Sequence, residues 1–524
     1  MALHPLHQQL LIASFMGKVG DNYTSNQKAC LSRFLLSPLT VDLSLSSRLW
    51  VQVFENDPEF SVFHQAMQHT DFDDFKTYFY SNEKNFSQGL NSQLFLDGLR
   101  YLIIPSLKWE CFLMNLRKCA LFELVDSGSE SSWMTDNLIA AIAEQCFLNE
   151  YVYWVSDYES EALEKIFDSI FCDSRCILPK IGIIGCYFRL SIYKTLTATL
   201  LEYERKGTLP DAYMSLIKRQ ILEPEQELRD SISIASFGNS IDPVSSRVRI
   251  HYERNPYPRW VSIGNPCMDT VRASLPFAKS EGLQILIAGC GTGAHAIRVS
   301  MMHPSATVTA IDLSLPSIAY AGRKAHEYGV KNLNLIQGDI LDVSMAGRIF
   351  DVIESVGVIH HMERPIDGLM ALIQVLKKGG YLHLGLYSRL ARKPIVDLRS
   401  RIGCSLDQFS DDCLRRLRLS LFGIGEDHPF RPFLEFDDFY TLSMARDLLC
   451  NQQEEYFDFG RIKDLLSVTN MEFVSFSDLS VQLKRKYQAI YPDDTMMTDF
   501  INWTEFEEKH QYIFSGMYKF WCKK

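Results

Sequence analysis

At 524 residues, with 47% of them hydrophobic and 22% charged, the chain can bury the cores of two or three domains. Its formal net charge of −11 argues against a nucleic-acid partner, because contacts with phosphates require a clustered basic surface. Thirteen cysteines without a C-x-x-C pair predict reduced thiols, and they argue against a disulfide framework or a zinc site.

No stretch of the sequence has the features of a targeting or membrane-spanning segment. The N-terminus lacks the basic region of a signal peptide, and the most apolar stretch, 177–190, is interrupted by Lys180 and Arg189. That stretch is also too short to cross a bilayer. We therefore expect a soluble, cytoplasmic protein with no membrane partner, and the oligomeric state stays open.

Residues 1–235 are predicted to form a helical domain. In the segments 136–156, 161–171 and 213–232, apolar residues recur at intervals of three and four, which favours amphipathic helices. No repeat of fixed period is visible, so a solenoid is not expected. This half of the chain shows no catalytic constellation.

Residues 236–265 are predicted to be a linker. The segment is rich in glycine, asparagine and proline and contains N-P-Y-P, which restricts the chain to extended conformations. Its aromatic residues Tyr252, Tyr257 and Trp260 are candidates for covering a ligand site, with Tyr252 as a catalytic candidate. A packed strap between two domains is the alternative.

From residue 266 onward the pattern alternates between strands and helices. Five short apolar runs are separated by helix-like segments of about a dozen residues, the length that a parallel crossover requires. This pattern predicts an open, doubly wound α/β sheet. The five runs are 283–288, 307–312, 333–339, 350–356 and 380–387, and two further strands are expected at 472–479 and 516–524.

The alternation stops over residues 388–470, which are expected to form a helical insertion after the fifth strand. An insertion beside the carboxyl ends of the strands is a natural lid or substrate-recognition element. An inert helical pad is the alternative. His428, within this insertion, is a weaker candidate for shaping the site.

A glycine loop follows the first of these strands. Gly289, Gly291 and Gly293 let the backbone approach a ligand closely. The dinucleotide fingerprint G-x-G-x-x-G has Ala294 at its last position, a replacement that the motif tolerates. The loop alone is therefore compatible with a dinucleotide, a phosphate, another adenosine compound or a simple turn.

Carboxylates end the next two strands. Asp312 follows Gly293 by 19 residues and is placed to accept hydrogen bonds from ribose hydroxyls, with a helix N-cap as the alternative. Asp339 can accept from an adenine amino group, with an ordinary turn aspartate as the alternative. Since ligands of such sheets bind at the carboxyl ends of the strands, the three strand ends together indicate adenosine.

The segment after the fourth strand contains His360 and His361. Neighbouring residues of an extended chain point in opposite directions, so the two rings are not expected to chelate one metal, and no metal site is predicted. One histidine can face the cleft as a general base or polar orienting group while the other packs or caps. Purely structural roles for both are the alternative.

These segments together resemble class I S-adenosylmethionine-dependent methyltransferases, a fold with a mostly parallel Rossmann-like sheet whose last strand is antiparallel. The resemblance rests on GCGTGAH, Asp312, GDIL, FDVIESVGVIHHM and LKKGGYLHLGLYS. It implies S-adenosylmethionine as the cofactor, with the glycine loop near its methionine part, Asp312 at the ribose and Asp339 at the adenine. The cofactor contacts it implies are Gly289, Cys290, Gly291, Thr292, Gly293, Asp312, Asp339, Ile340 and Ser355.

Further segments are similar to a bacterial methyltransferase group that is often fused to tetratricopeptide repeats. They are YERNPYPRW, AEQCFLNEYVYW, LEPEQELR and FSGMYKFWCKK, although the repeats themselves are absent here. The similarity implies a regulatory or substrate-recognition role for the helical domain. The expected domains are therefore 1–235, the linker 236–265 and a catalytic domain 266–524.

The prediction is a methyltransferase that acts on a small molecule or a protein. Two other functions compete with it: a nicotinamide-dependent oxidoreductase on the same kind of sheet, and a non-catalytic sensor of an adenosyl ligand. The glycine spacing and the two closing strands argue against the oxidoreductase.

Overall fold

The computed structural model describes residues 24–36, 43–127, 133–172, 177–238, 249–250, 253, 256, 259–263, 282–402, 410–451, 453–510, 513–514 and 516–524. They belong to two compact units. The helical unit lies within residues 1–225, 260–267 and 408–448, and the sheet unit lies within 226–259, 268–407 and 449–524. No helix in this part of the chain is both long and apolar enough to cross a membrane.

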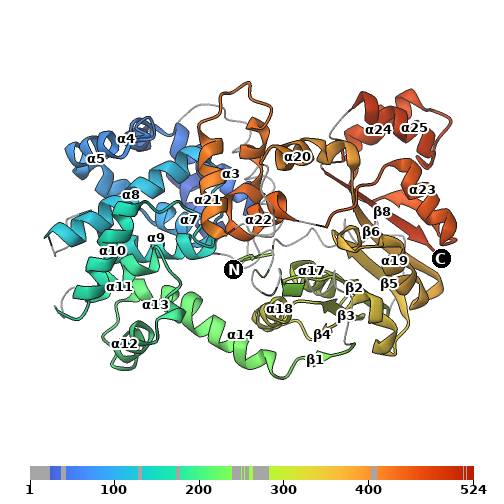
Figure 1. Ribbon diagram of the computed structural model, residues 1–524, viewed down its shortest axis with the longest axis horizontal. Coiled ribbons are helices and arrows are strands. Elements are labelled where there is room, and N and C mark those ends of the chain that lie inside the picture. Colours follow the sequence, from blue (N-terminus) through green and yellow to red (C-terminus); the bar gives the residue numbers. More distant parts are fainter. Residues whose placement is uncertain are drawn as a thin grey trace. The chain divides into compact units, whose positions relative to one another are not determined.

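The helical unit contains a series of helices and short 3-10 or π turns (Figure 1). They are α2 (Ser25–Leu35), α3 (Leu43–Asn56), η1 (Pro58–Phe60), α4 (Ser61–Ala66), α5 (Phe72–Ser81), α6 (Glu83–Leu90), α7 (Gln93–Tyr101), α8 (Leu107–Ser127), α9 (Asp136–Leu148), α10 (Asp157–Ser169), α11 (Ile177–Gly185), η3 (Leu190–Ile192), α12 (Lys194–Arg205), α13 (Asp211–Ile217), η4 (Lys218–Leu222), α21 (Asp411–Phe422), η8 (Arg431–Glu435) and η9 (Asp437–Tyr440). The helices α14 (Glu223–Ser231) and α22 (Leu442–Cys450) each run across a boundary between the units.

The predicted helix over 136–156 ends early, at Leu148. Its start is fixed by Thr135, whose side chain accepts a hydrogen bond from the Leu138 N–H. Its end is set by Glu150 and Tyr151, which adopt the left-handed backbone at φ 60° and 58°. Two successive non-glycine residues in that conformation stop the helix, so the last third of the predicted segment is a turn.

The sheet unit contains eight strands in the order β1-β4-β3-β2-β5-β6-β8-β7. All neighbouring strands pair in parallel except at β8, which is antiparallel to both β6 and β7. The predicted sheet with an antiparallel last strand is therefore confirmed. The strands are β1 (Ala235–Ser236), β2 (Gln284–Ala288), β3 (Thr307–Asp312), β4 (Leu333–Gln337), β5 (Phe350–Val356), β6 (Leu376–Tyr387), β7 (Glu472–Phe476) and β8 (Met517–Lys523).

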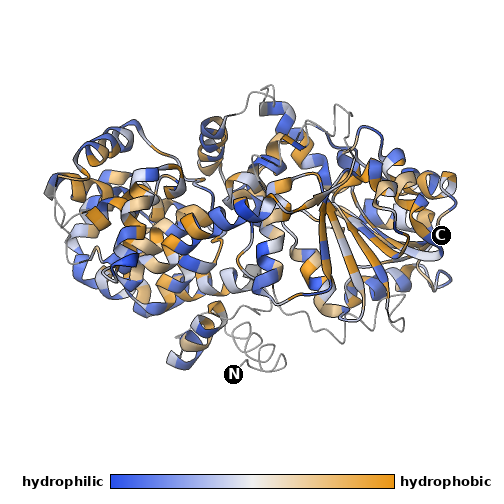
Figure 2. Ribbon diagram, turned by 90° about the horizontal axis from the view of Figure 1, so that it is seen from below, coloured by the Kyte–Doolittle hydropathy of each residue, from blue (hydrophilic) through white to orange (hydrophobic). Residues whose placement is uncertain are grey.

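Both faces of this sheet are buried under helices, which explains why its strands are continuously apolar. Along β2, Ile285 and Ile287 point to the face covered by α17, whereas Leu286 and Ala288 point to the face covered by α19. Figure 2 shows the strands as largely orange, between helices that carry both colours. The other elements of the unit are α17 (Ala294–Met302), α18 (Leu315–Glu327), η5 (Ile340–Ala346), η6 (Ile359–His361), α19 (Pro365–Gln374), α20 (Arg389–Ile402), α23 (Phe459–Val468), α24 (Val481–Ile490) and α25 (Phe500–Lys509).

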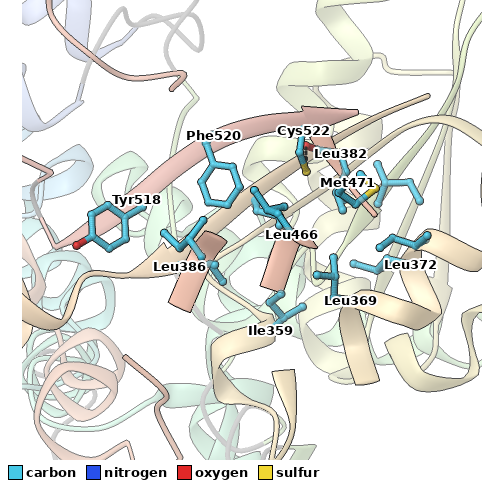
Figure 3. Packing of buried hydrophobic residues seen from close by; sticks show 14 of the residues in the cluster. Ile359, Leu369, Leu372, Leu382, Leu386, Leu466, Met471, Tyr518, Phe520 and Cys522 are labelled. Atoms are coloured by element: carbon cyan, nitrogen blue, oxygen red, sulfur yellow. Dashed lines mark hydrogen bonds between the residues drawn. The ribbon is translucent and has the colours of Figure 1, made fainter. Parts of the chain in front are cut away.

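The larger of the two cores lies on the α19 face. Figure 3 shows Leu382 and Leu386 of β6 and Phe520 of β8 packed with Leu369 and Leu372 of α19. Each of these side chains is fully buried. The core therefore joins the parallel strands to the antiparallel β8 as one body.

The first edge strand, β1, is not predicted by the sequence. It has two residues and straddles the predicted boundary between the helical domain 1–235 and the linker 236–265, yet Ala235 and Ser236 pair in parallel with β4. A two-residue strand carries no periodic signal, so pattern analysis cannot detect it.

The structure divides the predicted insertion 388–470 between the two units. Its beginning, α20, and its end belong to the sheet unit, whereas 408–448 belongs to the helical unit. The buried Arg418 of α21 holds this part in place, because its guanidinium donates two hydrogen bonds to the Glu110 carboxylate of α8, at 2.8 and 3.0 Å. The units thus depart from the three predicted domains, which followed chain order.

Candidate functional site

The glycine loop lies at the carboxyl end of β2, beside the topological switch point. Strands β3 and β4 lie on one side of β2, and β5 lies on the other. Gly289, Gly291 and Gly293 all have positive φ angles, of 79°, 51° and 84°. A side chain at Gly289 would overlap Val358, and one at Gly293 would overlap Ala321. Close packing and backbone conformation therefore both require these glycines.

The loop presents backbone rather than side chains. The Cys290 side chain is nearly buried and that of Thr292 is fully buried. The Gly289 and Cys290 N–H groups both donate to the Ile311 carbonyl of β3, at 2.9 Å. Any ligand at this loop would accordingly meet main-chain atoms.

Asp312, at the end of β3, braces the loop. One carboxylate oxygen accepts from the Gly291 N–H at 2.7 Å, and the other accepts from the Ser314 N–H at 2.9 Å. The N-cap of α18 is Ser314, not Asp312. Burial raises the pKa of the Asp312 carboxyl, although these N–H donors act against that rise. Asp312 therefore fixes the loop, and its ribose contact stays a prediction.

Asp339 has one occupied and one unoccupied carboxylate oxygen. Oδ1 accepts from the Leu341 N–H at 2.9 Å and caps η5, which is the turn role considered for it. Oδ2 is buried and has no hydrogen-bond partner among the described residues. The hydroxyl of Ser355, fully buried near the end of β5, also lacks a partner there. Buried polar atoms are normally paired, so these two mark a place for a polar ligand.

Ile340, the residue after Asp339, is buried in the core on the α19 face. It belongs to the first turn of η5. Its side chain thus packs in this core just after β4. A contact between Ile340 and adenine stays a prediction.

His360 lies in η6, after β5, and is fully buried. Neither ring nitrogen forms a hydrogen bond with a side chain among the described residues, although the Gly385 backbone of β6 acts on the ring as an acceptor. The ring packs on Tyr387 of β6 with the ring centroids 3.8 Å apart. Burial lowers the pKa of His360 well below its ordinary value, and the charge of Arg392 adds to the effect. His360 is accordingly a neutral imidazole at pH 7.

The His361 ring, unlike that of His360, contacts polar groups of a distant segment of the chain. Its Nδ1 lies 2.9 Å from the Gln453 carbonyl and 3.2 Å from the Asn451 side-chain nitrogen. A carbonyl can only accept, so Nδ1 carries the proton. The ring therefore fastens η6 to the segment around residue 453, and the two neighbouring histidines have different environments.

The aromatic candidates of the linker are only partly described. Tyr252 and Tyr257 lie outside the described residues. Trp260 is nearly buried and is grouped with the helical unit. His428 belongs to that unit as well, where its Nδ1 accepts from the Phe430 N–H at 3.2 Å and so shapes a local turn.

The sequence analysis missed a polar cluster around the buried Glu354, in which the His295 side chain is partly exposed. Glu354 of β5 lies between His295 of α17 and His383 of β6, with each histidine nitrogen within 3.0 Å of the same carboxylate oxygen. The sequence did contain a signal for this cluster, because Glu354 is a carboxylate within the otherwise largely apolar run FDVIESV. Among the described residues, no group of three or more His, Cys, Asp or Glu side chains is arranged to hold a metal ion.

Comparison with known proteins finds similarity to methyltransferases over part of the chain. Residues 285–380 match the family model described as a methyltransferase domain. An uncharacterised protein of Synechococcus sp. is 38% identical over 120 residues, which cover 23% of this chain and 29% of that protein. The mitochondrial ubiquinone biosynthesis O-methyltransferase of Schizosaccharomyces pombe is 35% identical over 126 residues, which cover 23% of this chain and 45% of the enzyme.

A solved structure, PKMT2 from Rickettsia typhi in complex with AdoHcy, is also similar, at a TM-score of 0.35 and 15% identity. The similarity covers 55% of this chain and 54% of that one. The matched segment spans less than half the length of each of the two relatives above. The match with the family model runs from β2 into β6, so this part of the sheet unit is similar to a methyltransferase domain.

Proposed function

We propose that this protein transfers a methyl group from S-adenosylmethionine to a small-molecule or protein acceptor. The observation that carries the proposal is the carboxyl edge of the sheet. There a glycine loop braced by Asp312 accompanies two buried and unpaired polar atoms, Asp339 Oδ2 and Ser355 Oγ. A buried polar atom without a hydrogen bond destabilises the folded protein, and a ligand that pairs with it removes this cost.

The residues at this edge fit the cofactor. The backbone of the loop would meet its methionine part, the Asp312 carboxylate would accept from the ribose hydroxyls, and Asp339 Oδ2 would accept from the adenine amino group. When bound, the cofactor supplies an electrophilic methyl group on a sulfonium. The chain's contribution is then alignment of the acceptor and exclusion of water, which together account for several kcal/mol of barrier lowering.

His360 is the proposed general base, in preference to His361. His360 is preferred because its ring is neutral and is held by no side-chain hydrogen bond, so it can turn a nitrogen toward an acceptor proton, whereas the His361 ring is fixed through Nδ1 by the Gln453 carbonyl and offers only Nε2. Several curated relatives are named O-methyltransferases, among them a malonyl-[acyl-carrier protein] O-methyltransferase of Halalkalibacterium halodurans that is 32% identical over 108 residues. A hydroxyl or carboxyl oxygen is therefore the acceptor chemistry to test first.

Calorimetric titration of the full chain with S-adenosylmethionine and with NAD tests the cofactor directly. We expect micromolar or tighter binding of S-adenosylmethionine and none of NAD. Tight binding of NAD without S-adenosylmethionine would instead indicate an oxidoreductase.

Tracing of labelled methyl groups in native lysate then tests catalysis and identifies the acceptor. Transfer of label that requires the protein supports the enzyme. Cofactor binding without transfer to any component would replace the enzyme with a non-catalytic sensor of an adenosyl ligand.

A further inference from the structure

The cluster around the buried Glu354 extends across the α17 face of the sheet as a continuous polar chain. Nε2 of His295 lies 3.0 Å from Glu354 Oε2, and Nδ1 of His383 lies 2.9 Å from the same oxygen. On its far side, Nε2 of His383 lies 2.9 Å from the Ser477 hydroxyl. The His383 ring stacks on Trp521, with centroids 4.4 Å apart and planes 10° apart. This stacking fixes the direction of its two nitrogens.

This geometry keeps Glu354 charged although it is buried. Burial alone would raise the pKa of the carboxyl, but the charges and hydrogen bonds of His295 and His383 outweigh it and hold that pKa well below the ordinary value. A buried carboxylate is tolerated when donors surround it, and it then holds those donors firmly. One carboxylate oxygen of Glu354, Oε2, thus holds both histidine rings beside β5.

The position of His295 gives the cluster a link to the cofactor loop. His295 is the second residue of α17, and the N-cap of that helix is Gly293, the last glycine of the loop. β5 pairs with β2, with Glu354 opposite Ile287 near the point where β2 enters the loop. The hydrogen bond between His295 and Glu354 therefore ties the start of α17, next to the loop, to the neighbouring strand β5.

The glycine loop is consequently braced from both sides of β2. On the β3 side, Asp312 binds the Gly291 N–H at 2.7 Å. On the β5 side, Glu354 binds His295 at 3.0 Å. The strand between them has no polar side chain beyond Gln284, so these two carboxylates supply the side-chain hydrogen bonds beside the loop, in addition to the backbone bonds that Gly289 and Cys290 donate to Ile311.

We infer that Glu354 and His295 are positioning residues for cofactor binding, the β5 counterpart of Asp312. The inference rests on the proposed function, because the bound ligand is the proposed cofactor. Neither residue needs to touch the cofactor or the acceptor. The pair sets the orientation of the loop backbone relative to β5. The three alternating glycines are too flexible to maintain that orientation themselves.

The test is calorimetric titration of the full chain with S-adenosylhomocysteine, which requires no knowledge of the acceptor. We expect His295→Ala and Glu354→Gln each to weaken binding about tenfold, the effect of one lost charge-assisted hydrogen bond. The double variant should bind about as weakly as either single one, because the two changes remove the same interaction. His295→Gln, whose amide can still donate to Glu354, should recover most of the affinity.

His326→Ala is the matched control, because His326 is an exposed histidine near the end of α18. It should bind as the wild type does, and thermal unfolding shows which variants are folded. If folded His295→Ala bound as tightly as the wild type, or if His295→Gln were no better than His295→Ala, the positioning role would be wrong. A wild-type chain that bound neither S-adenosylhomocysteine nor S-adenosylmethionine would overturn the proposed function itself.

Discussion

The helical unit and the carboxyl edge of the sheet both bury polar side chains. The helical unit buries charged groups as ion pairs, although some of its polar atoms, such as Trp109 Nε1, lack a partner among the described residues, whereas the unpaired atoms of the sheet edge lie at the ends of its strands. In the helical unit, Arg418 is paired with Glu110, and the fully buried Arg117 is paired with Glu159 at 3.0 Å. At the edge of the sheet, Asp339 Oδ2 and Ser355 Oγ are buried without a partner among the described residues. Paired charges hold a fold together, whereas unpaired polar atoms at one edge are free to bind something else.

The largest expected effect tests the paired side of this comparison. Arg418→Leu leaves the Glu110 carboxylate buried without its counter-charge, so we expect a loss of about 3–5 kcal/mol in the free energy of unfolding. Urea unfolding followed by circular dichroism measures it. Lys206→Ala, which removes an exposed ion pair with Glu202 in the same unit, should change the midpoint little. An unchanged midpoint for Arg418→Leu would show that the buried pair does not stabilise the unit.

The next prediction tests whether the edge of the sheet binds through its backbone. Gly291→Val places a branched side chain at φ 51° in the loop, where it strains the backbone and fills the approach to the main chain. Affinity for S-adenosylmethionine should fall at least about 100-fold, or about 3 kcal/mol. Gly329→Ala, at φ 66° with open space around it, is the control and should bind normally. Equal affinity in both variants would refute the placement of the cofactor.

A third prediction separates the two neighbouring histidines. His360→Gln should lower the rate of methyl transfer about 100-fold, the lower range for a general base, while cofactor affinity stays within about twofold. His361→Gln should act mainly on thermal stability, because its ring ties η6 to the Gln453 carbonyl. Transfer of labelled methyl groups and calorimetry provide the two measurements. The opposite order of effects on the rate would assign the base to His361.

The fourth prediction concerns the two roles of Asp312. Asp312→Ala removes the loop brace and the proposed ribose acceptor together, so cofactor affinity should weaken by about 1–3 kcal/mol. Asp351→Ala is the matched control, because Asp351 also accepts from a backbone N–H of β2, that of Gln284 at 2.8 Å, but at the amino end of the strand. Calorimetry should find this control unchanged in affinity. Equal losses in both variants would mean that Asp312 acts only through the stability of the sheet.

The smallest effect is a difference in pH dependence between the two carboxylates that brace the loop. The pKa of Glu354 is lowered in the folded state, so its stabilising contribution is full above the ordinary 4.5 and is lost as the pH falls toward the folded value. The pKa of Asp312 is raised, so its contribution has the opposite sign and grows on acidification.

Urea unfolding at about pH 7 and about pH 3.5 measures the direction of both contributions. On acidification, the stability advantage of the wild type over Glu354→Gln should shrink. The advantage over Asp312→Asn should grow. If acidification changed the stability difference between wild type and variant in the same direction for Glu354→Gln and for Asp312→Asn, the pKa values of the two carboxyls would not be shifted in opposite directions.

The sequence predicted the parts of the fold that carry a local periodic signal. The strands 307–312 and 350–356 have the predicted bounds, because an apolar run between turn residues is visible in any fully buried parallel strand. The strand β1 and the early end of α9 were missed, since one is too short to have a period and the other depends on two left-handed residues.

At the site, the sequence by itself was enough to predict the class of ligand. Glycines at 289, 291 and 293 with carboxylates at 312 and 339 are enough to indicate an adenosyl cofactor, because each residue is placed by the end of its own strand. Only the tertiary structure distinguished His360 from His361, since their difference depends on which ring the distant Gln453 carbonyl meets.

The tertiary structure likewise decided the role of Glu354 and the membership of residues 408–448. Glu354 is held by histidines from α17 and β6, and Arg418 reaches a carboxylate about 300 positions earlier in the chain. Hydrophobic periodicity is a property of neighbouring residues, whereas a buried charge is stabilised by whichever partner the fold brings within hydrogen-bond distance. That is why the sequence was enough to predict the sheet and its cofactor class, and only the folded chain decided how its charges are paired.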